Sequence, residues 1–156
     1  MADNVVFEDF SIRVKKVIEN AAIAGLYEAA SELESQVKQN SRRDTSKTMG
    51  SFKHYVDDSA LTAFIGSDSI NSLYEEFGTG EYALEGKGRK GAWYVPADKV
   101  TGRKKPAYFG QVIVIEKNGK KFYKTNGKKP TKAFQLAYKY KKNALIRIIE
   151  NKMRGI

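Results

Sequence analysis

The sequence predicts an α+β protein: a small, mostly antiparallel sheet with a long N-terminal helix and a C-terminal helix. Apolar residues recur at steps of three and four over two long stretches, residues 7–39 and 130–153, which is typical of amphipathic helices. Short β-rich runs separated by turn residues lie between them, which indicates strands. The resulting order is helix, two strands, short helix, three strands, helix, with no internal repeat, and this order favours the α+β class.

The first helix is predicted from Phe7 to Gln39. Gly25 weakens it locally, and also allows a bend or a close crossing by another segment. The apolar stripe fits three interpretations: ordinary core, a subunit contact, or both. Its members are Phe10, Val14, Val17, Ala21, Ala24, Leu33 and Val37.

A polar, helix-poor segment, Asn40–Gly50, is predicted to be a loop. The runs Ser51–Asp57 and Leu61–Gly66 then have the composition of two strands, and the turn residues Asp57-Asp58-Ser59 between them predict a hairpin. A short helix is expected over Asn71–Phe77, capped by Ser69 or Asn71. Gly78-Thr79-Gly80 ends it.

The second half holds the clearest local signal, the pair Asn118-Gly119 between the runs 112–116 and 121–125. Both central positions of a type I′ turn need positive φ, so this pair predicts a tight hairpin. The strand 112–115 is apolar on both faces, which predicts cover on both. A short strand is expected at 92–96, between basic loops at 81–91 and 98–105.

The last helix is expected to run from Pro130, which suits a first helical turn, to about Met153. Lys141 interrupts its otherwise apolar inner stripe. That stripe consists of Phe134, Ala137, Lys141, Ala144, Leu145, Ile148 and Ile149.

Acidic and basic residues are distributed unevenly between the two halves of the chain. Residues 1–85 carry 8 Lys and Arg against 15 Asp and Glu, and residues 86–156 carry 20 against 3, for a net charge of +10. Such polarity favours a nucleic-acid surface or head-to-tail packing between copies. A solvated basic face with no partner is the third interpretation.

Several function classes are disfavoured. The chain has no cysteine and one histidine, His54, which removes disulfides, cysteine nucleophiles and the usual zinc sites. We expect His54 to be an ordinary half-exposed strand residue. The segment Gly80–Gly88 fails as a phosphate loop, because five residues rather than four separate Gly80 from Gly86 and Gly88 occupies the Ser/Thr position. We therefore expect no enzyme, cofactor, metal or small-molecule substrate.

One enzymatic alternative stays open, catalysis by carboxylates, with Glu75, Glu76 or Asp57 as candidates. No apolar run is long enough to predict a membrane span. The acidic residues Asp3, Glu8 and Asp9 near the N-terminus do not fit a signal peptide.

Two basic loops near aromatic residues raise the possibility of nucleic-acid binding, because such loops provide phosphate contacts and base stacking. Trp93 and Tyr94 lie within an apolar strand, which favours core positions for them, while Tyr108 and Phe109 are also close in sequence. The candidate DNA-facing residues are Lys87, Arg89, Lys90, Arg103, Lys104 and Lys105.

Three sequence blocks resemble the minor neck, or head–tail joining (tail-completion), proteins of long-tailed bacteriophages. Tyr74-Glu75-Glu76-Phe77-Gly78-Thr79 closely matches that family's Tyr-x-Glu-Phe-Gly-Thr block. Asp44-Thr45 and Ser51 fit an earlier Asp-Thr-Gly-x-Leu block, in which Ser46 replaces the glycine and Thr48 the leucine. Of the Pro-Phe-x-x-Pro-Ala element that opens the family's last helix, Ala133-Phe134 keeps the phenylalanine.

The resemblance implies that residues 1–156 form a single head–tail joining domain. Its function would be that of a structural subunit of the virion, assembled in the host cytoplasm as part of a neck or tail-completion ring. The partners implied are other copies of the chain and the adjacent neck, adaptor and tail proteins. DNA would pass through the ring and contact it without sequence readout. The alternative is a free-standing basic nucleic-acid-binding protein.

The central block predicts the subunit interface. Phe77 is expected to anchor the segment in the core, and Gly78 and Gly80 to supply unusual backbone angles. Glu75 and Glu76 are expected at the rim, either facing basic residues of a neighbouring copy or simply solvated. The complete candidate interface is Glu75, Glu76, Phe77, Gly78, Thr79 and Gly80.

Overall fold

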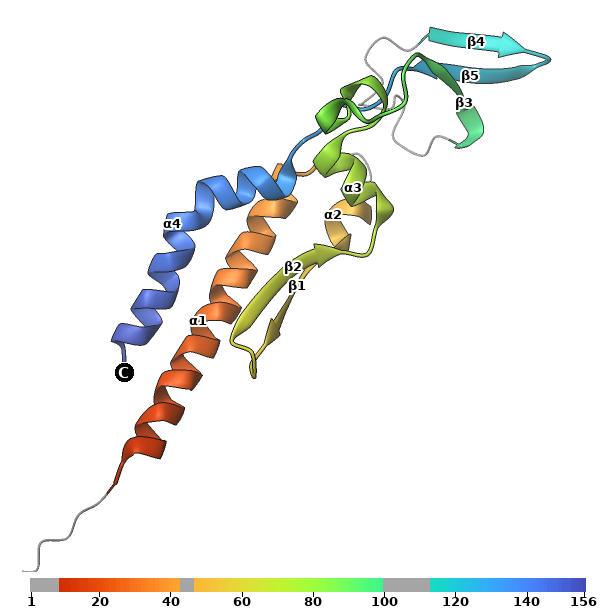
Figure 1. Cartoon of the computed structure of the whole chain (residues 1–156). Helices are drawn as coiled ribbons and strands as arrows, with labels where there is room; N and C mark the ends of the chain where they lie inside the picture. Colours follow the sequence, from red (N-terminus) through yellow and green to blue (C-terminus); the bar gives the residue numbers. More distant parts are fainter. Residues whose placement is uncertain (1–8, 43–46, 100–112) are drawn as a thin grey trace, which may run out of the picture.

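The computed structural model describes residues 9–42, 47–99 and 113–156 of the chain. Helices α1 (Ser11–Asn40) and α4 (Ala133–Arg154) lie antiparallel and side by side, and we call this pair the helical body. The strands β1 (Phe52–Asp57) and β2 (Thr62–Ser67) form an antiparallel hairpin against another flank of α1. Helix α1 thus lies between α4 and this hairpin (Figure 1).

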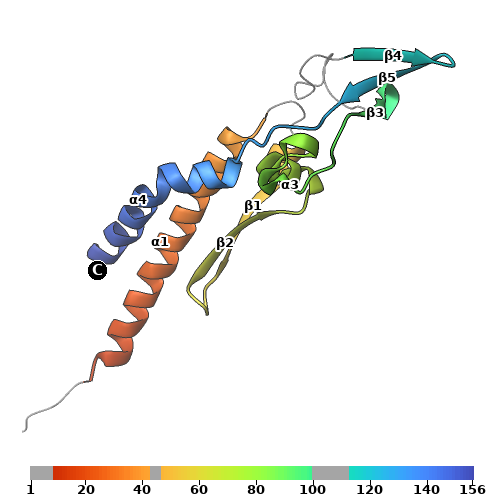
Figure 2. The ribbon, with the colours of Figure 1, turned by 45° about the horizontal axis from the view of Figure 1, so that its top comes forward.

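The remaining strands form a second sheet, which we call the distal sheet. It has the order β3-β5-β4 and is antiparallel throughout. Figure 2 shows it beyond the end of the helical body rather than beneath a helix. The α+β class, the two long helices and the small antiparallel sheets are confirmed, although the five strands divide into two sheets. The other elements are α2 (Lys47–Ser51), α3 (Ile70–Phe77), β3 (Trp93–Pro96), β4 (Ile113–Lys117) and β5 (Lys120–Thr125).

The two long helices approach closely at Gly25. A Cβ atom built there would lie 3.1 Å from the Cα of Ile149, which confirms the predicted close crossing. Two ion pairs join the helices, Lys141 Nζ to Glu32 Oε1 at 2.6 Å and Lys152 Nζ to Glu28 Oε2 at 2.8 Å. The first explains why a lysine interrupts the inner stripe of α4. Part of the acidic half of the chain is therefore matched internally by the basic half.

A small core forms where the end of α1, the start of α4 and β1 meet. It contains Val37, Phe52, Ala133 and Ala137. The Phe52 ring meets the half-buried Phe134 ring edge to face, with centroids 5.3 Å apart, an arrangement that aromatic pairs prefer. This core holds both the hairpin and the start of α4 in place on α1.

Glu34 of α1 ties the hairpin to the helical body. One carboxylate oxygen accepts hydrogen bonds from the backbone N–H of His54 at 2.8 Å and from its Nδ1 at 2.6 Å, and the other oxygen pairs with Lys38. Burial raises the pKa of Glu34, but the hydrogen bonds from Lys38 and His54 together outweigh it and leave the pKa below its usual value. His54 is a half-buried strand residue, as predicted.

The two predicted hairpin turns are confirmed. Asn118 and Gly119 have φ of +52° and +69°, as the predicted type I′ hairpin requires. The Asp57 carboxylate accepts the backbone N–H groups of Ser59 and Ala60, both at 3.0 Å, which fixes the turn of the first hairpin. The Ser59 hydroxyl also donates to this carboxylate. Its hydrogen bond, followed by those of the backbone, lowers the pKa of Asp57.

Four expectations of the fold are wrong. The predicted loop over residues 40–50 contains most of α2. Helix α4 begins at Ala133 rather than Pro130, since Lys132 has a left-handed φ of +55°. Ala144 of its predicted inner stripe is exposed. Ile115, predicted to be covered, is 36% exposed. No helix in the described ranges is long and apolar enough to cross a membrane.

Candidate subunit-contact surface

Helix α3 presents its apolar side to solvent. Ile70, Leu73, Tyr74 and Phe77 follow the spacing i, i+3, i+4, i+7 and form one face, which we call the α3 stripe. Leu73 and Phe77 are 50% and 49% exposed, and the other two are similarly open. Soluble monomers rarely leave such an apolar face uncovered, which makes the α3 stripe a candidate contact surface.

The opposite side of α3 is buried and acidic. Glu76 is 6% exposed, and its two carboxylate oxygens accept the backbone N–H groups of Phe134 at 2.8 Å and Gln135 at 3.1 Å. These N–H groups belong to the first turn of α4, where no intrahelical acceptor exists. A carboxylate also suits the partial positive charge of a helix N-terminus. Glu76 therefore acts as the cap of α4 from a distant helix.

Glu75 is buried beside it and holds the segment that leads into α4. Its carboxylate pairs with the Lys128 ammonium and accepts the Thr131 hydroxyl at 3.1 Å. Its backbone carbonyl accepts the N–H of Thr131 at 2.7 Å. The two glutamates thus fix the rotation of α3, and the apolar stripe is turned outward as a consequence.

The glycine-bearing end of the block forms a tight junction with the strand-to-helix linker. Thr79 donates its N–H to the carbonyl of Lys128 at 2.8 Å, and Glu81 donates to that of Asn126 at 2.9 Å. Gly80 has a φ of +61°, and a Cβ there would lie 2.1 Å from the Asn126 carbonyl oxygen. Only glycine meets both conditions. Gly78, with a φ of +73°, ends α3, and a Cβ there would lie 2.7 Å from the Tyr82 carbonyl oxygen.

These observations correct two expectations. Phe77 does not anchor the block in the core of this chain, and Glu75 and Glu76 do not lie at a solvated rim. The reason is that the start of α4 and the Lys128 ammonium lie on one side of α3, and they bind carboxylates better than a phenyl ring. Gly78, Thr79 and Gly80 serve the internal junction. Only Phe77 of the six predicted interface residues lies on the exposed stripe.

The sequence contained the signal for the rest of the stripe. Ile70 and Leu73 share the helical spacing of Tyr74 and Phe77, and that spacing alone would have grouped them. The direction in which the group faces depends instead on hydrogen bonds between residues more than fifty positions apart, which periodicity does not reveal.

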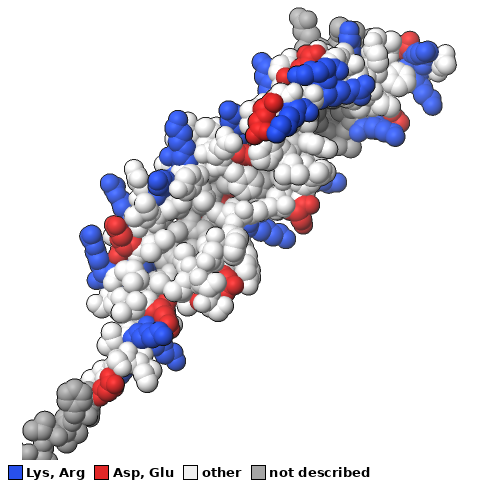
Figure 3. Space-filling view, in the orientation of Figure 1, with Lys and Arg blue, Asp and Glu red and all other residues white. Residues whose placement is uncertain are grey.

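The predicted DNA-facing residues are placed in part. Lys87, Arg89 and Lys90 are exposed between α3 and the distal sheet, whereas Arg103, Lys104 and Lys105 lie outside the described residues. The Arg89 guanidinium lies 5.4 Å from the ring centroid of the half-buried Trp93, a cation–π contact. Tyr94, predicted to be core, is instead 53% exposed. Figure 3 shows Lys and Arg gathered over the distal end, above a largely uncharged middle.

Comparison with known proteins gives no match. No family model, no curated protein and no solved structure matches this chain. The resemblance to phage neck proteins therefore stays a prediction that rests on the sequence blocks themselves.

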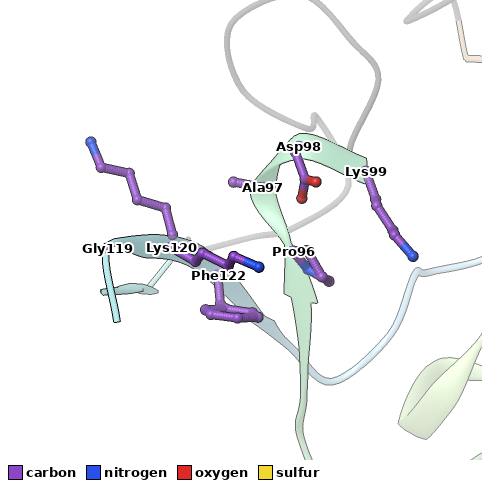
Figure 4. A pocket seen from close by; sticks show the side chains of 8 residues that line it. Pro96, Ala97, Asp98, Lys99, Gly119, Lys120 and Phe122 are labelled. Atoms are coloured by element: carbon purple, nitrogen blue, oxygen red, sulfur yellow. The ribbon is translucent and has the colours of Figure 1, made fainter. Parts of the chain in front are cut away.

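A hollow of about 610 Å³ lies at the edge of the distal sheet, between the 3₁₀ turn Ala97–Lys99 and the β4–β5 turn. Figure 4 shows the Asp98 carboxylate and the Phe122 ring in it, with Lys99 pointing away from Phe122. The carboxylates considered for catalysis, Glu75, Glu76 and Asp57, do not line it. The carboxylates of Glu76 and Asp57 instead accept backbone N–H groups, and that of Glu75 accepts the Thr131 hydroxyl and pairs with Lys128.

A second apolar surface lies at the other end of the helical body. Phe10, just before α1, and Val14 and Val17 in its first turns are exposed members of the predicted stripe, so this part of the stripe is not core. Together with the end of α4 they form an open hollow of about 620 Å³, which we call the end hollow. It is lined by Phe10, Arg13, Val14, Val17, Ile18, Met153 and Ile156.

Proposed function

We propose that this chain is a structural virion subunit of a tailed bacteriophage, part of the neck or tail-completion ring that connects head to tail and through which DNA passes. The observation that carries the proposal is the outward apolar face of α3, which includes Tyr74 and Phe77 of the block that resembles the neck family. A subunit that works only in an assembly keeps such faces for its neighbours. Its partners are other copies of the chain and the adjacent neck, adaptor and tail proteins.

The internal chemistry agrees with a structural role. Glu75 and Glu76, the most buried carboxylates of the described chain, are both used to hold the start of α4. The Gly78-Thr79-Gly80 junction fixes the distal sheet to α3 through backbone hydrogen bonds. The block thus forms a rigid support for a contact surface.

Complementation in the phage or prophage that encodes the chain tests the proposal. Without the gene, separate filled heads and complete tails should accumulate, as seen by electron microscopy. Leu73→Asp should reproduce this defect, because it places a charge on the α3 stripe. Tyr140→Asp is the matched control, since Tyr140 is 66% exposed on α4 and lies on neither apolar surface, and it should restore joined particles. Joined particles without the gene would refute the proposal.

A second function, free-standing nucleic-acid binding, draws on the basic residues near the distal sheet. Lys87, Arg89 and Lys90 are exposed there, and contacts to phosphates need no sequence readout. Titration of duplex DNA with the purified chain tests it. Salt-sensitive binding that is lost when these three residues are changed to Glu, in a chain that ignores neck and tail proteins, would favour this alternative.

A further inference from the structure

We propose that the α3 stripe of one copy docks into the end hollow of a second copy, which gives a head-to-tail contact between two different surfaces of the same chain. The inference rests on the proposed function in one respect, that the α3 stripe is a protein-contact surface. It goes further by naming the occupant of each apolar surface.

The shapes of the two surfaces correspond. The stripe is a ridge of four large side chains on one helix face, and the end hollow is an open depression between the ends of α1 and α4. An amphipathic helix that lays an i, i+3, i+4, i+7 face into an apolar groove is a recurrent mode of protein recognition. Six of the seven residues that line the end hollow are apolar, so docking would remove both surfaces from water.

The charges around the two surfaces are also complementary. Arg13 lines the end hollow, and the exposed residues next to its lining residues in sequence include the basic Lys16 and Arg154 and one acid, Asp9. The α3 stripe is preceded by the exposed Asp68. Its own two glutamates are buried on the other side of the helix, so the stripe itself carries no charge into the hollow. Docking of one stripe on another would lack this match, which favours the unlike pairing.

The two surfaces cannot meet within one molecule. Helix α3 lies beside the C-terminal end of α1, and the end hollow is formed at the N-terminal end of the same helix (Figure 1). Contact between them therefore joins different copies. Because the surfaces differ, each copy keeps one free surface after pairing, and the contact repeats until a ring closes or a filament grows.

Two variants separate the surfaces. Leu73→Asp disrupts the stripe, and Val14→Asp disrupts the end hollow. Leu73 and Val14 are 50% and 54% exposed, so neither change places a charge in the core, and circular dichroism should show unchanged helix content. Tyr140→Asp adds the same charge to an exposed aromatic position elsewhere and serves as the control.

Light scattering over a range of concentrations gives the mass of each sample. The wild-type chain and Tyr140→Asp should form species several times heavier than the 17.5 kDa chain, whereas each surface variant alone should remain at the mass of one chain. An equimolar mixture of Leu73→Asp and Val14→Asp should reach twice that mass and no more. In that pair the intact stripe of one variant fills the intact hollow of the other, and no further contact follows.

Three outcomes would overturn the inference: a wild-type chain that stays monomeric at every concentration, surface variants that assemble like wild type, or a mixture that remains monomeric. The proposed function is judged separately. If the chain does not self-associate but Leu73→Asp still prevents head–tail joining, the stripe binds a different virion protein and the structural role stands. If joining is also unaffected by loss of the whole gene, both proposals fail.

Discussion

Helices α3 and α4 are both amphipathic, yet they turn opposite faces inward. Helix α4 packs apolar residues, Ala133 and Ala137 among them, against the core. Helix α3 instead buries Ser72, Glu75 and Glu76 and exposes its apolar stripe. The difference lies in the neighbours of each helix. Helix α4 packs on the apolar face of α1, whereas α3 faces the N–H groups at the start of α4 and the Lys128 ammonium.

The apolar face of an amphipathic helix is therefore not always the face that is buried, as α3 shows. A buried carboxylate is stable only when hydrogen bonds or an ion pair compensate for its lost hydration, and α3 has both. Burying Phe77 instead would leave the N–H groups of Phe134 and Gln135 without their acceptor. The chain therefore satisfies these polar groups and leaves the apolar α3 stripe exposed.

The largest effect should come from comparing two phenylalanines. Phe52→Ala removes a fully buried ring and should lower the free energy of unfolding by about 3–5 kcal/mol. Phe77→Ala removes a half-exposed ring and should change it by no more than about 0.5 kcal/mol, while weakening assembly. Urea denaturation of both variants measures this. Equal losses would contradict the outward orientation of α3.

The junction behind α3 should be the next most sensitive. Gly80→Ala introduces a Cβ at positive φ and 2.1 Å from a backbone oxygen, so we expect a loss of about 3 kcal/mol from strain and overpacking together. Gly86→Ala is the matched control, because Gly86 also has a positive φ of +65° but nothing lies within 4 Å of its Cβ position. Its loss should be only about 1 kcal/mol. Similar losses for the two would show that the junction is not tightly packed.

Removal of the distant cap should have a moderate effect. Glu76→Ala leaves the N–H groups of Phe134 and Gln135 without an acceptor and should cost about 1–3 kcal/mol. Hydrogen exchange at those two amides should become faster relative to amides in the middle of α4. If the exchange rates of the two amides do not change, Glu76 is not the cap of this helix.

The smallest effect concerns the hairpin and depends on pH. The pKa of Glu34 is lowered in the folded chain, so its contribution to stability is complete above its usual value of 4.5 and is lost as the pH falls through the lowered value. Glu34→Gln should therefore cost about 1 kcal/mol at pH 7 and progressively less in acid. Denaturation at several pH values measures this, and a difference that is the same at all of them would contradict it.

The features that depend on residues close in sequence were predicted correctly. The long helices, the Asn118-Gly119 turn and the order of elements follow from spacing and turn residues. The orientation of α3 does not, because Glu76 finds its partners at Phe134 and Gln135, far along the chain. The start of α4 was missed for a related reason, since the backbone carbonyl of Glu75 binds Thr131 and holds the linker outside the helix.

Helix α3 exposes Tyr74 and Phe77 in the single chain, and we expect assembly to cover them. Hydroxyl-radical footprinting tests this directly, because it reports the solvent exposure of single aromatic side chains. In the dilute chain we expect Tyr74 and Phe77 to be oxidised about as readily as Tyr140, and Phe52 to be protected. At concentrations where the chain assembles, Tyr74 and Phe77 should become protected while Tyr140 does not. Protection of Phe77 equal to that of Phe52 in the dilute chain would contradict the account.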